Sequence, residues 1–149
     1  FAKRSSGDAE PVAVEEVMAG TALLLRDRMR MLDARLEVEG AMLSVRAERV
    51  GLEQVLVNLI QNALDAGALT IRILVTPYKD RVAITVSDDG TGLTDEVRAS
   101  LFMPFKTSKR NGLGLGLVIC RDIVTGFGGT LIAASPPAGA AFVIDLERA

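Results

Sequence analysis

Residues 52–66 read Leu-Glu-Gln-Val-Leu-Val-Asn-Leu-Ile-Gln-Asn-Ala-Leu-Asp-Ala, and this stretch decides the fold. Its apolar residues recur at helical spacing, which predicts an amphipathic helix from about Glu48 that Gly67 ends. Asn58 and Asn62 are four residues apart, so a helix places them on one face beside the apolar stripe. Because an amide is costly to bury without a partner, the pair favours a ligand or a metal. The alternative is that both amides lie at the edge of the stripe and bond to water or to neighbouring loops.

The composition is that of one globular domain. The chain has 149 residues, 49% of them hydrophobic, and a net charge of -2. Without a basic excess or a basic stripe interleaved with aromatic residues, nucleic-acid binding is disfavoured. The single cysteine, Cys120, excludes an internal disulfide, and its helical apolar surroundings predict a small buried hydrophobe in a reducing compartment. No apolar run approaches the length of a membrane span, and the first residues do not form a signal peptide.

The rest of the chain alternates between helical and strand patterns. A short strand is expected at Val12 and a surface helix from Val14, and a later helix carries an inner stripe of Ile119, Ile123 and Phe127. We expect the other elements at Arg35–Glu39, Leu43–Arg46, Thr70–Thr76, Arg81–Ser87, Leu115–Phe127, Thr130–Ser135 and Ala141–Leu146. Gly40 is expected to turn the first of these strands into the second. This order predicts an α+β domain in which helices cover one face of a mixed, mainly antiparallel sheet.

Two glycine-rich stretches carry candidate chemistry. The first, Asp89-Gly-Thr-Gly92, directly follows a strand, and the carboxylate of Asp89 could accept a hydrogen from an exocyclic amine such as that of adenine. Its glycines would let the backbone approach a flat ring. The alternative is an ordinary Asp-Gly turn.

The second stretch, Gly112-Leu-Gly-Leu-Gly116-Leu, opens a helix, where free amide groups and the helix dipole form a phosphate cradle. It follows a loop instead of a strand and lacks the Walker A lysine, so neither the Rossmann nor the P-loop motif fits. Side chains just before it could reach phosphates, or could belong to a solvated loop. They are Lys106, Thr107, Ser108, Lys109 and Arg110. Phe102, Pro104 and Phe105 could anchor a movable lid or be plain core residues.

Three motifs follow one another along the chain: paired asparagines on a helix, Asp-x-Gly-x-Gly after a strand, and a glycine-rich helix start. In this order, they resemble those of the ATP-binding catalytic domain of sensor histidine kinases, within the gyrase, Hsp90, histidine kinase and MutL superfamily. The resemblance covers nearly the whole chain. Its boxes are Asn58–Ala63 (N box), Asp89–Gly92 (G1), Phe102–Lys109 (F box and lid), Gly112–Gly116 (G2) and Gly126–Gly129 (a terminal glycine box). The end of the chain is most similar to kinases of the nitrogen-regulatory and C4-dicarboxylate-sensing type. The resemblance implies the Bergerat ATP-binding fold, a two-layer α/β sandwich of about five strands and three helices.

The resemblance also implies ATP and Mg²⁺ as cofactors. Asn62 would offer its oxygen to Mg²⁺, Asn58 would assist at the phosphates or the metal shell, and Asp89 would bind the adenine amino group. The expected catalytic residues are Asn58, Lys106 and Lys109. The expected nucleotide contacts are Asn58, Asn62, Asp65, Asp89, Gly90, Gly92, Leu93, Phe105, Thr107, Ser108, Lys109, Gly112, Leu113, Gly114, Leu115 and Gly116. Departures from the family pattern are Met103 for an acidic residue, Ser108 for a common threonine, and Ala140 and Ala141 where relatives carry a hydroxyl.

The same resemblance discriminates a kinase from an ATPase. ATPases of the superfamily place a glutamate one helical turn before the metal asparagine, as base for the attacking water. Here that position is Asn58, whose amide cannot accept a proton at neutral pH, so rapid hydrolysis should be lost. The alternatives are a slow ATPase of the same fold and a non-catalytic, nucleotide-responsive interaction module.

The chain contains no histidine, so a phosphate acceptor must lie on another segment. The resemblance implies a helical dimerisation domain directly upstream that carries this histidine. We therefore expect residues 1–11 to be a linker from that domain and residues 12–149 to be the catalytic domain. A response regulator would act downstream. The parent is expected to be a homodimer anchored in the bacterial inner membrane, with this domain in the cytoplasm.

Overall fold

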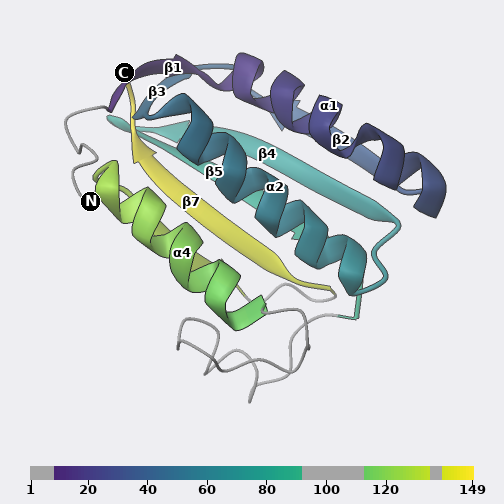
Figure 1. Cartoon of the computed structure of the whole chain (residues 1–149). Helices are drawn as coiled ribbons and strands as arrows, with labels where there is room; N and C mark the ends of the chain where they lie inside the picture. The colour runs from purple at the N-terminus through teal and green to yellow at the C-terminus, as the bar shows by residue number, and fades with distance from the viewer. Residues whose placement is uncertain (1–8, 92–112, 135–138) are drawn as a thin grey trace.

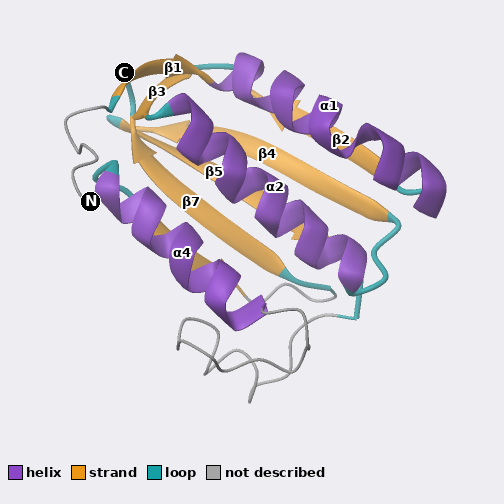
Figure 2. Ribbon diagram, in the orientation of Figure 1, coloured by secondary structure: helices purple, strands orange, loops and turns teal. Residues whose placement is uncertain are grey.

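In the part of the chain that the structure describes, three helices lie side by side over one face of a five-stranded sheet (Figures 1 and 2). The structure is a computed structural model that describes residues 9–91, 113–134 and 139–149, without the side chains of residues 113–115. Its helices are α1 (Val14–Leu32), α2 (Arg49–Asp65) and α4 (Leu113–Gly126). Its strands are β1 (Glu10–Ala13), β2 (Arg35–Gly40), β3 (Ser44–Ala47), β4 (Thr70–Tyr78), β5 (Arg81–Asp88), β6 (Thr130–Ala134) and β7 (Ala141–Glu147). These elements confirm the predicted two-layer α+β sandwich.

The sheet is mixed and mainly antiparallel. Its strand order is β2-β4-β5-β7-β6, and only β2 and β4 run parallel. Strands β1 and β3 form a separate two-stranded sheet beside the start of α1. The helix α2 connects the parallel pair as a crossover, which is the connection that parallel neighbours require.

The predicted hairpin between the strands at 35–39 and 43–46 is wrong. Strand β2 pairs with β4, whereas β3 pairs with β1. Gly40 has φ +107, and a methyl group added there would lie 2.2 Å from the carbonyl oxygen of Val75, so the chain at Gly40 stays against β4. The N–H of Val14 then bonds the carbonyl of Leu43, which ties β3 to the start of α1. An alternating pattern predicts a strand but does not name its partner.

The core lies between the helices and the inner face of the sheet. As predicted, alternate residues of β4 and β5 are buried, and they are Ile71, Ile73, Val75, Val82, Ile84 and Val86. Helix α2 contributes Leu52, Leu56, Leu59, Ile60 and Ala63. Its first turn is capped by the Glu48 carboxylate, which accepts a hydrogen bond of 3.2 Å from the N–H of Gly51.

Helix α4 buries a different stripe from the predicted one. Its buried residues include Leu117, Cys120 and Val124, whereas Ile119 is 41% exposed. Ile123 and Phe127 pack only partly against the core. The helix is apolar on two adjacent faces, so spacing alone could not choose between them. The burial of Cys120 is confirmed.

Helices α2 and α4 run antiparallel, with α2 between α1 and α4 (Figure 1). A methyl group added at Gly51, in the first turn of α2, would lie 3.0 Å from side-chain atoms of both Ile123 and Phe127 near the end of α4. One added at Gly116, near the start of α4, would instead meet Asn58 in the second half of α2. The end of α2 therefore lies beside the start of α4.

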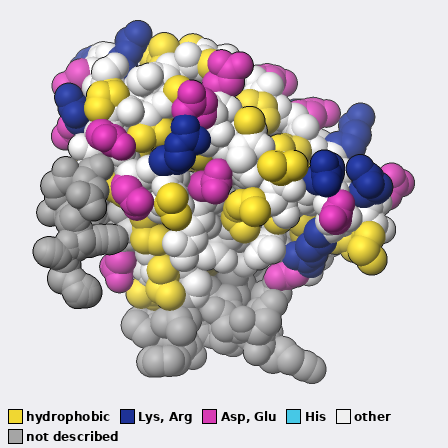
Figure 3. Space-filling view, turned by 45° about the horizontal axis from the view of Figure 1, so that its top comes forward, with side chains coloured by type: hydrophobic (Ala, Val, Ile, Leu, Met, Phe, Trp, Pro, Cys, Tyr) yellow, Lys and Arg dark blue, Asp and Glu magenta, His cyan; other side chains and the backbone are white. Residues whose placement is uncertain are grey.

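On the face shown in Figure 3, acidic and basic side chains are intermingled with apolar ones, so no single sign of charge dominates it. Within the described part of the chain, no helix has both the length and the apolarity needed to cross a membrane.

Candidate functional site

Both asparagines of α2 are half-buried, and Asn58 faces α4. A methyl group added at Gly116 would lie 3.7 Å from Oδ1 and 3.9 Å from Nδ2 of Asn58, so the glycine leaves the amide room. The thiol of Cys120 lies one turn after Gly116 on α4 and is buried, and burial raises its pKa to about 11. Asn62 follows one turn later on nearly the same face, toward the start of α4.

The end of β5 brings a carboxylate to the same side of the sheet. Asp88 follows the alternation of Val82, Ile84 and Val86, and so lies on the face that the helices cover. Its Oδ1 accepts a hydrogen bond of 2.7 Å from the N–H of Gly90. Burial raises the pKa of Asp88, and the backbone N–H groups of Gly90 and Ala140 partly offset this rise.

The turn after β5 contacts Ala66, which is the C-cap residue of α2. The N–H of Thr91 bonds the carbonyl of Ala66 at 3.2 Å, and a methyl group added at Gly90 would lie 2.9 Å from the same oxygen. The end of β5, the end of α2 and the start of α4 therefore lie at the same end of the domain, and these elements carry Asp88, Asn62 and Asn58. We call these three residues and the first turn of α4 the α2–α4 site. It offers amide and carboxylate oxygens together with free helix-start amides, a donor set suited to a nucleotide with Mg²⁺.

Comparison with known proteins identifies the family to which this chain belongs. The model of the histidine kinase-, DNA gyrase B-, and HSP90-like ATPase family matches residues 47–149. The chain belongs to this family. Within it, the relatives identify the chain as a sensor histidine kinase catalytic domain, which confirms the family that the three motifs predicted.

Two sensor proteins and two solved structures illustrate the similarity of this kinase domain. It is 42% identical, over its full length, to the C4-dicarboxylate transport sensor protein DctB of Rhizobium meliloti and 37% identical, over 98% of its length, to DctS of Rhodobacter capsulatus. It spans only 25% and 23% of those proteins. The nucleotide-free catalytic domain of the histidine kinase ThkA superposes with a TM-score of 0.82 at 29% identity, covering 93% of this chain and 96% of that one. ThkA in complex with the response regulator protein TrrA gives 0.80 at 25% identity, covering 95% and 42%.

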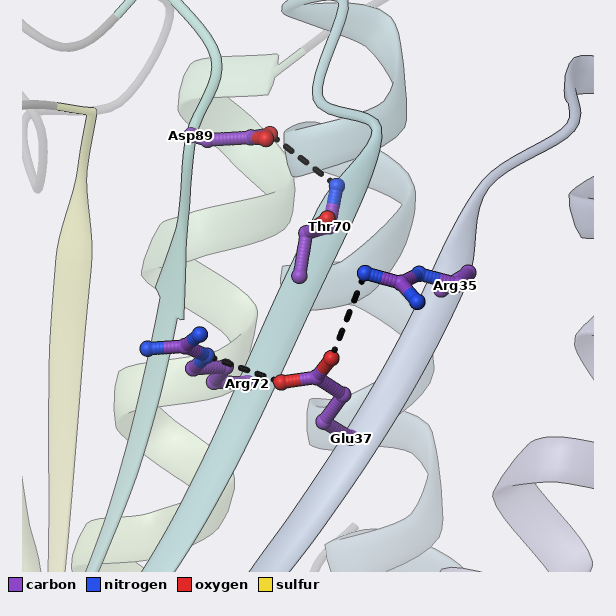
Figure 4. A network of polar contacts seen from close by, with 5 residues as sticks. All are labelled: Arg35, Glu37, Thr70, Arg72 and Asp89. Carbon is purple, nitrogen blue, oxygen red and sulfur yellow. Dashed lines mark hydrogen bonds and ion pairs between the residues drawn. The ribbon is translucent and has the colours of Figure 1, made fainter.

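The kinase domain places Asp89 on the other face of the sheet from the α2–α4 site. Its Oδ1 accepts hydrogen bonds from the N–H groups of Leu69 (2.8 Å) and Thr70 (3.0 Å). Figure 4 shows this carboxylate beside Thr70, with the ion pairs of Glu37 to Arg72 and Arg35 further along the strands. This differs from the prediction that Asp89 faces the nucleotide, because one step along a strand reverses the side chain.

The residue that sequence reasoning missed is Asp88. A signal for it was present, because Asp88-Asp89-Gly90-Thr91-Gly92 fits Asp-x-Gly-x-Gly only when counted from Asp88. The alternation of β5 gives the same answer, since its inward residues are even-numbered up to Val86.

Some of the other predicted nucleotide contacts of the kinase domain lie among the described residues, and the rest lie outside them. The Asp65 carboxylate pairs with Arg28 of α1, with 2.7 Å between Oδ1 and Nη2, so it joins two helices. The backbone of Leu113, Gly114 and Leu115 forms the first turn of α4, which begins two residues before the predicted start at Leu115, and Gly90 and Gly116 lie at the α2–α4 site. The predictions for Gly92, Leu93, Phe105, Lys106, Thr107, Ser108, Lys109 and Gly112, and for the F box as a whole, lie outside the described residues.

The two bonds that Asp89 accepts predict a change in acid stability. They lower the pKa of Asp89 below its ordinary value of 3.8, so its stabilisation is complete above that pH and is lost as the pH falls through the folded pKa. Replacing Asp89 by Asn keeps an acceptor oxygen at every pH. We therefore expect the urea midpoint of Asp89→Asn to fall less steeply than that of the wild type when the pH is lowered from 5 to 3. Only the wild type loses the stabilisation that the ionised Asp89 carboxylate provides. Parallel curves would contradict this assignment.

Proposed function

We propose that this domain binds Mg-ATP at the α2–α4 site and transfers the γ-phosphoryl group to a histidine on a separate segment. The observation that supports it most directly is the convergence of Asn58, Asn62 and Asp88 on the start of α4. The family includes ATP-binding domains, and the oxygens present suit a hard cation that keeps most of its ligands as water and phosphate. Among the described residues, no cluster of three or more His, Cys, Asp or Glu could hold a metal by itself.

At the end of the site that would hold adenine, we propose that Asp88 takes the role first predicted for Asp89, which is to bind the adenine amino group. Its half-buried carboxylate has four acceptor positions and uses one of them on the N–H of Gly90. The remaining lone pairs could accept a hydrogen from the amino group of adenine. The bond from Gly90 holds the carboxylate in position before a ligand binds.

At the end of the site that would hold the phosphates, the residues of the domain supply oxygen ligands and a positive electrostatic potential. The Asn62 amide oxygen would hold Mg²⁺, which neutralises phosphate charge when bound. Asn58 would assist at the phosphates. The α4 helix begins at this point, so its free N–H groups and dipole favour negative charge there. Lys106 and Lys109 are proposed to compensate charge on the γ-phosphate side.

The chemistry around Asn58 favours phosphoryl transfer over hydrolysis. An amide at this position cannot remove a proton from water. The nearest cysteine along α4, Cys120, has a pKa raised by burial to about 11 and is a neutral thiol near pH 7. Neither of these two described groups can act as the base for an attacking water, which favours positioning of an external histidine.

The proposal extends to the whole protein of which this domain spans a part. We propose an upstream dimerisation segment that carries the acceptor histidine, the residues before β1 as the linker to it, and a response regulator downstream. The complex of ThkA with TrrA and the similarity to C4-dicarboxylate transport sensors support such a two-component parent. A homodimer anchored in the inner membrane, with this domain in the cytoplasm, is part of the same proposal.

Calorimetric titration of the chain with ATP and Mg²⁺ tests the binding step. We expect saturable binding to one site per chain. Absence of heat and of competition with a fluorescent ATP analogue would contradict the proposal.

Asn62→Ala tests the metal assignment. Because the variant removes the proposed Mg²⁺ oxygen and leaves Asp88 intact, ATP should still bind, but the ratio of its affinities with and without Mg²⁺ should fall to about one. Gln54→Ala is a matched control, since Gln54 is an exposed amide on the same helix. A Mg²⁺ dependence retained in Asn62→Ala would move the metal site to another residue.

A further inference from the structure

The connection between α2 and β4, residues 66–70, is fastened to the turn after β5. Two backbone hydrogen bonds join them, from the N–H of Thr91 to the carbonyl of Ala66 (3.2 Å) and from the N–H of Asp89 to the carbonyl of Thr70 (3.3 Å). The connection follows the helix that carries the two asparagines of the α2–α4 site, whereas the turn follows the strand that carries its carboxylate. This attachment therefore sets how the two ends of the site lie relative to each other.

The Asp89 carboxylate attaches the same two segments through a side chain. Its Oδ1 accepts hydrogen bonds from the N–H groups of Leu69 at 2.8 Å and of Thr70 at 3.0 Å, the second of which is drawn in Figure 4. The N–H groups of residues 66–68 bond carbonyls at the end of α2. The carboxylate thus accepts from the two N–H groups of the connection that the helix end does not use. These two bonds, to a charged acceptor, are also shorter than the two backbone bonds.

We propose that Asp89 is a positioning residue, whose carboxylate holds the turn after β5 against the end of α2 and thereby keeps Asp88 in place relative to Asn62. This inference rests on the proposed function, because adenine and Mg²⁺ are what Asp88 and Asn62 would bind. Successive residues along a strand point to opposite faces, so Asp88 faces the helices while Asp89 bonds the backbone on the other side. Without the Asp89 carboxylate, the two longer backbone bonds remain, and the turn is less firmly held where the hydrogen bond to adenine would form.

The opposing view is that Asp89 only stabilises the fold. Asp89→Ala removes the acceptor and Asp89→Asn keeps an acceptor oxygen, and neither leaves a buried cavity because Asp89 is exposed. Asp145→Ala is the matched control. Asp145 lies on the same outer face of the sheet but opposite Ala83, near the start of β5, and its Oδ1 accepts a hydrogen bond of 2.7 Å from Arg81. A purely structural role predicts that both alanine variants lower the free energy of unfolding and that neither changes the nucleotide affinity of the folded protein.

The positioning role predicts a loss of affinity that is specific to adenine. In calorimetric titrations with Mg-ATP at a temperature where all variants are folded, Asp89→Ala should weaken binding on the order of fivefold, whereas Asp89→Asn and Asp145→Ala should stay within about twofold of the wild type. A purine ribonucleoside triphosphate lacks the amino group that Asp88 would bind, so Asp89→Ala should weaken its binding less than that of ATP. In an Asp88→Asn background, Asp89→Ala should change the ATP affinity by less than about twofold, because the group through which it acts is already altered.

Hydrogen exchange gives a readout that does not need the nucleotide. The backbone amides of Leu69 and Thr70 should be protected in the wild type and in Asp89→Asn, and should exchange on the order of tenfold faster in Asp89→Ala. Unchanged exchange in Asp89→Ala, a wild-type ATP affinity in that variant, or an equal loss for ATP and for the purine nucleotide would overturn the inference alone. Failure of the wild type to bind ATP would instead defeat the proposed function and, with it, the inference that rests on it.

Discussion

Replacing Asp88 by asparagine is expected to weaken ATP binding on the order of 10- to 100-fold, the range expected for losing a hydrogen bond to a charged group. An asparagine has one acceptor oxygen, whereas the Asp88 carboxylate must accept both from Gly90 and from the adenine amino group. The amide NH₂ would also face one of these donors. The loss should be larger for ATP than for a purine nucleotide that lacks the amino group, which a competition experiment can measure.

The matched control for this prediction is the neighbouring aspartate. Asp89→Asn changes the same charge, one residue away, on the opposite face of the sheet. We expect its ATP affinity to stay within about twofold of the wild type. If Asp89→Asn lost affinity while Asp88→Asn kept it, the sequence-based assignment of Asp89 would be right and the reassignment to Asp88 wrong.

Gly139→Ala is expected to destabilise the domain by about 3 kcal/mol or more, through backbone strain and a steric clash. Gly139 has φ +73, and a methyl group there would lie 1.8 Å from the carbonyl oxygen of Asp88. That oxygen belongs to the backbone of β5 and cannot move aside as a flexible side chain would. The neighbouring bond from the N–H of Asp88 to the carbonyl of Ala140, 2.9 Å long, would be displaced as well.

Urea unfolding measures this loss, and the same variant reports on the site. Because Gly139 lies directly against Asp88, Gly139→Ala should also weaken ATP binding under conditions where the protein remains folded. Gly126→Ala is the control, since a methyl group at this last residue of α4 meets nothing within 4 Å. An unfolding free energy equal in the two variants would show that β5 and the segment before β7 are not in close contact.

The elements could be predicted from sequence because their signals are local. Apolar spacing located α2 with its paired asparagines, and alternation gave the buried faces of β4 and β5. The order of these elements was enough for the two-layer α+β class. The hairpin at Gly40 failed because strand pairing depends on distant segments, in this case on β4 and β1.

At the site, the aspartate chosen from the sequence and the aspartate that faces the helices in the structure differ by one residue. Two adjacent aspartates end β5, and only the phase of the strand tells which of them faces the helices. The buried face of α4 was also beyond reach, because α4 is apolar on two faces and only packing against α2 turns Cys120 inward. The convergence of Asn62, Asp88 and the start of α4 depends on the antiparallel arrangement of α2 and α4, which no local pattern encodes.

Phosphate transfer from γ-labelled ATP with Mg²⁺ tests the central claim most directly. The chain would be assayed alone and together with the upstream histidine-bearing segment of its parent. We expect acid-labile, base-stable label on that segment and little free phosphate from the chain alone, because Asn58 and Cys120 provide no base. Rapid release of free phosphate by the chain alone, with no label on the histidine segment, would contradict this claim and identify the domain as an ATPase.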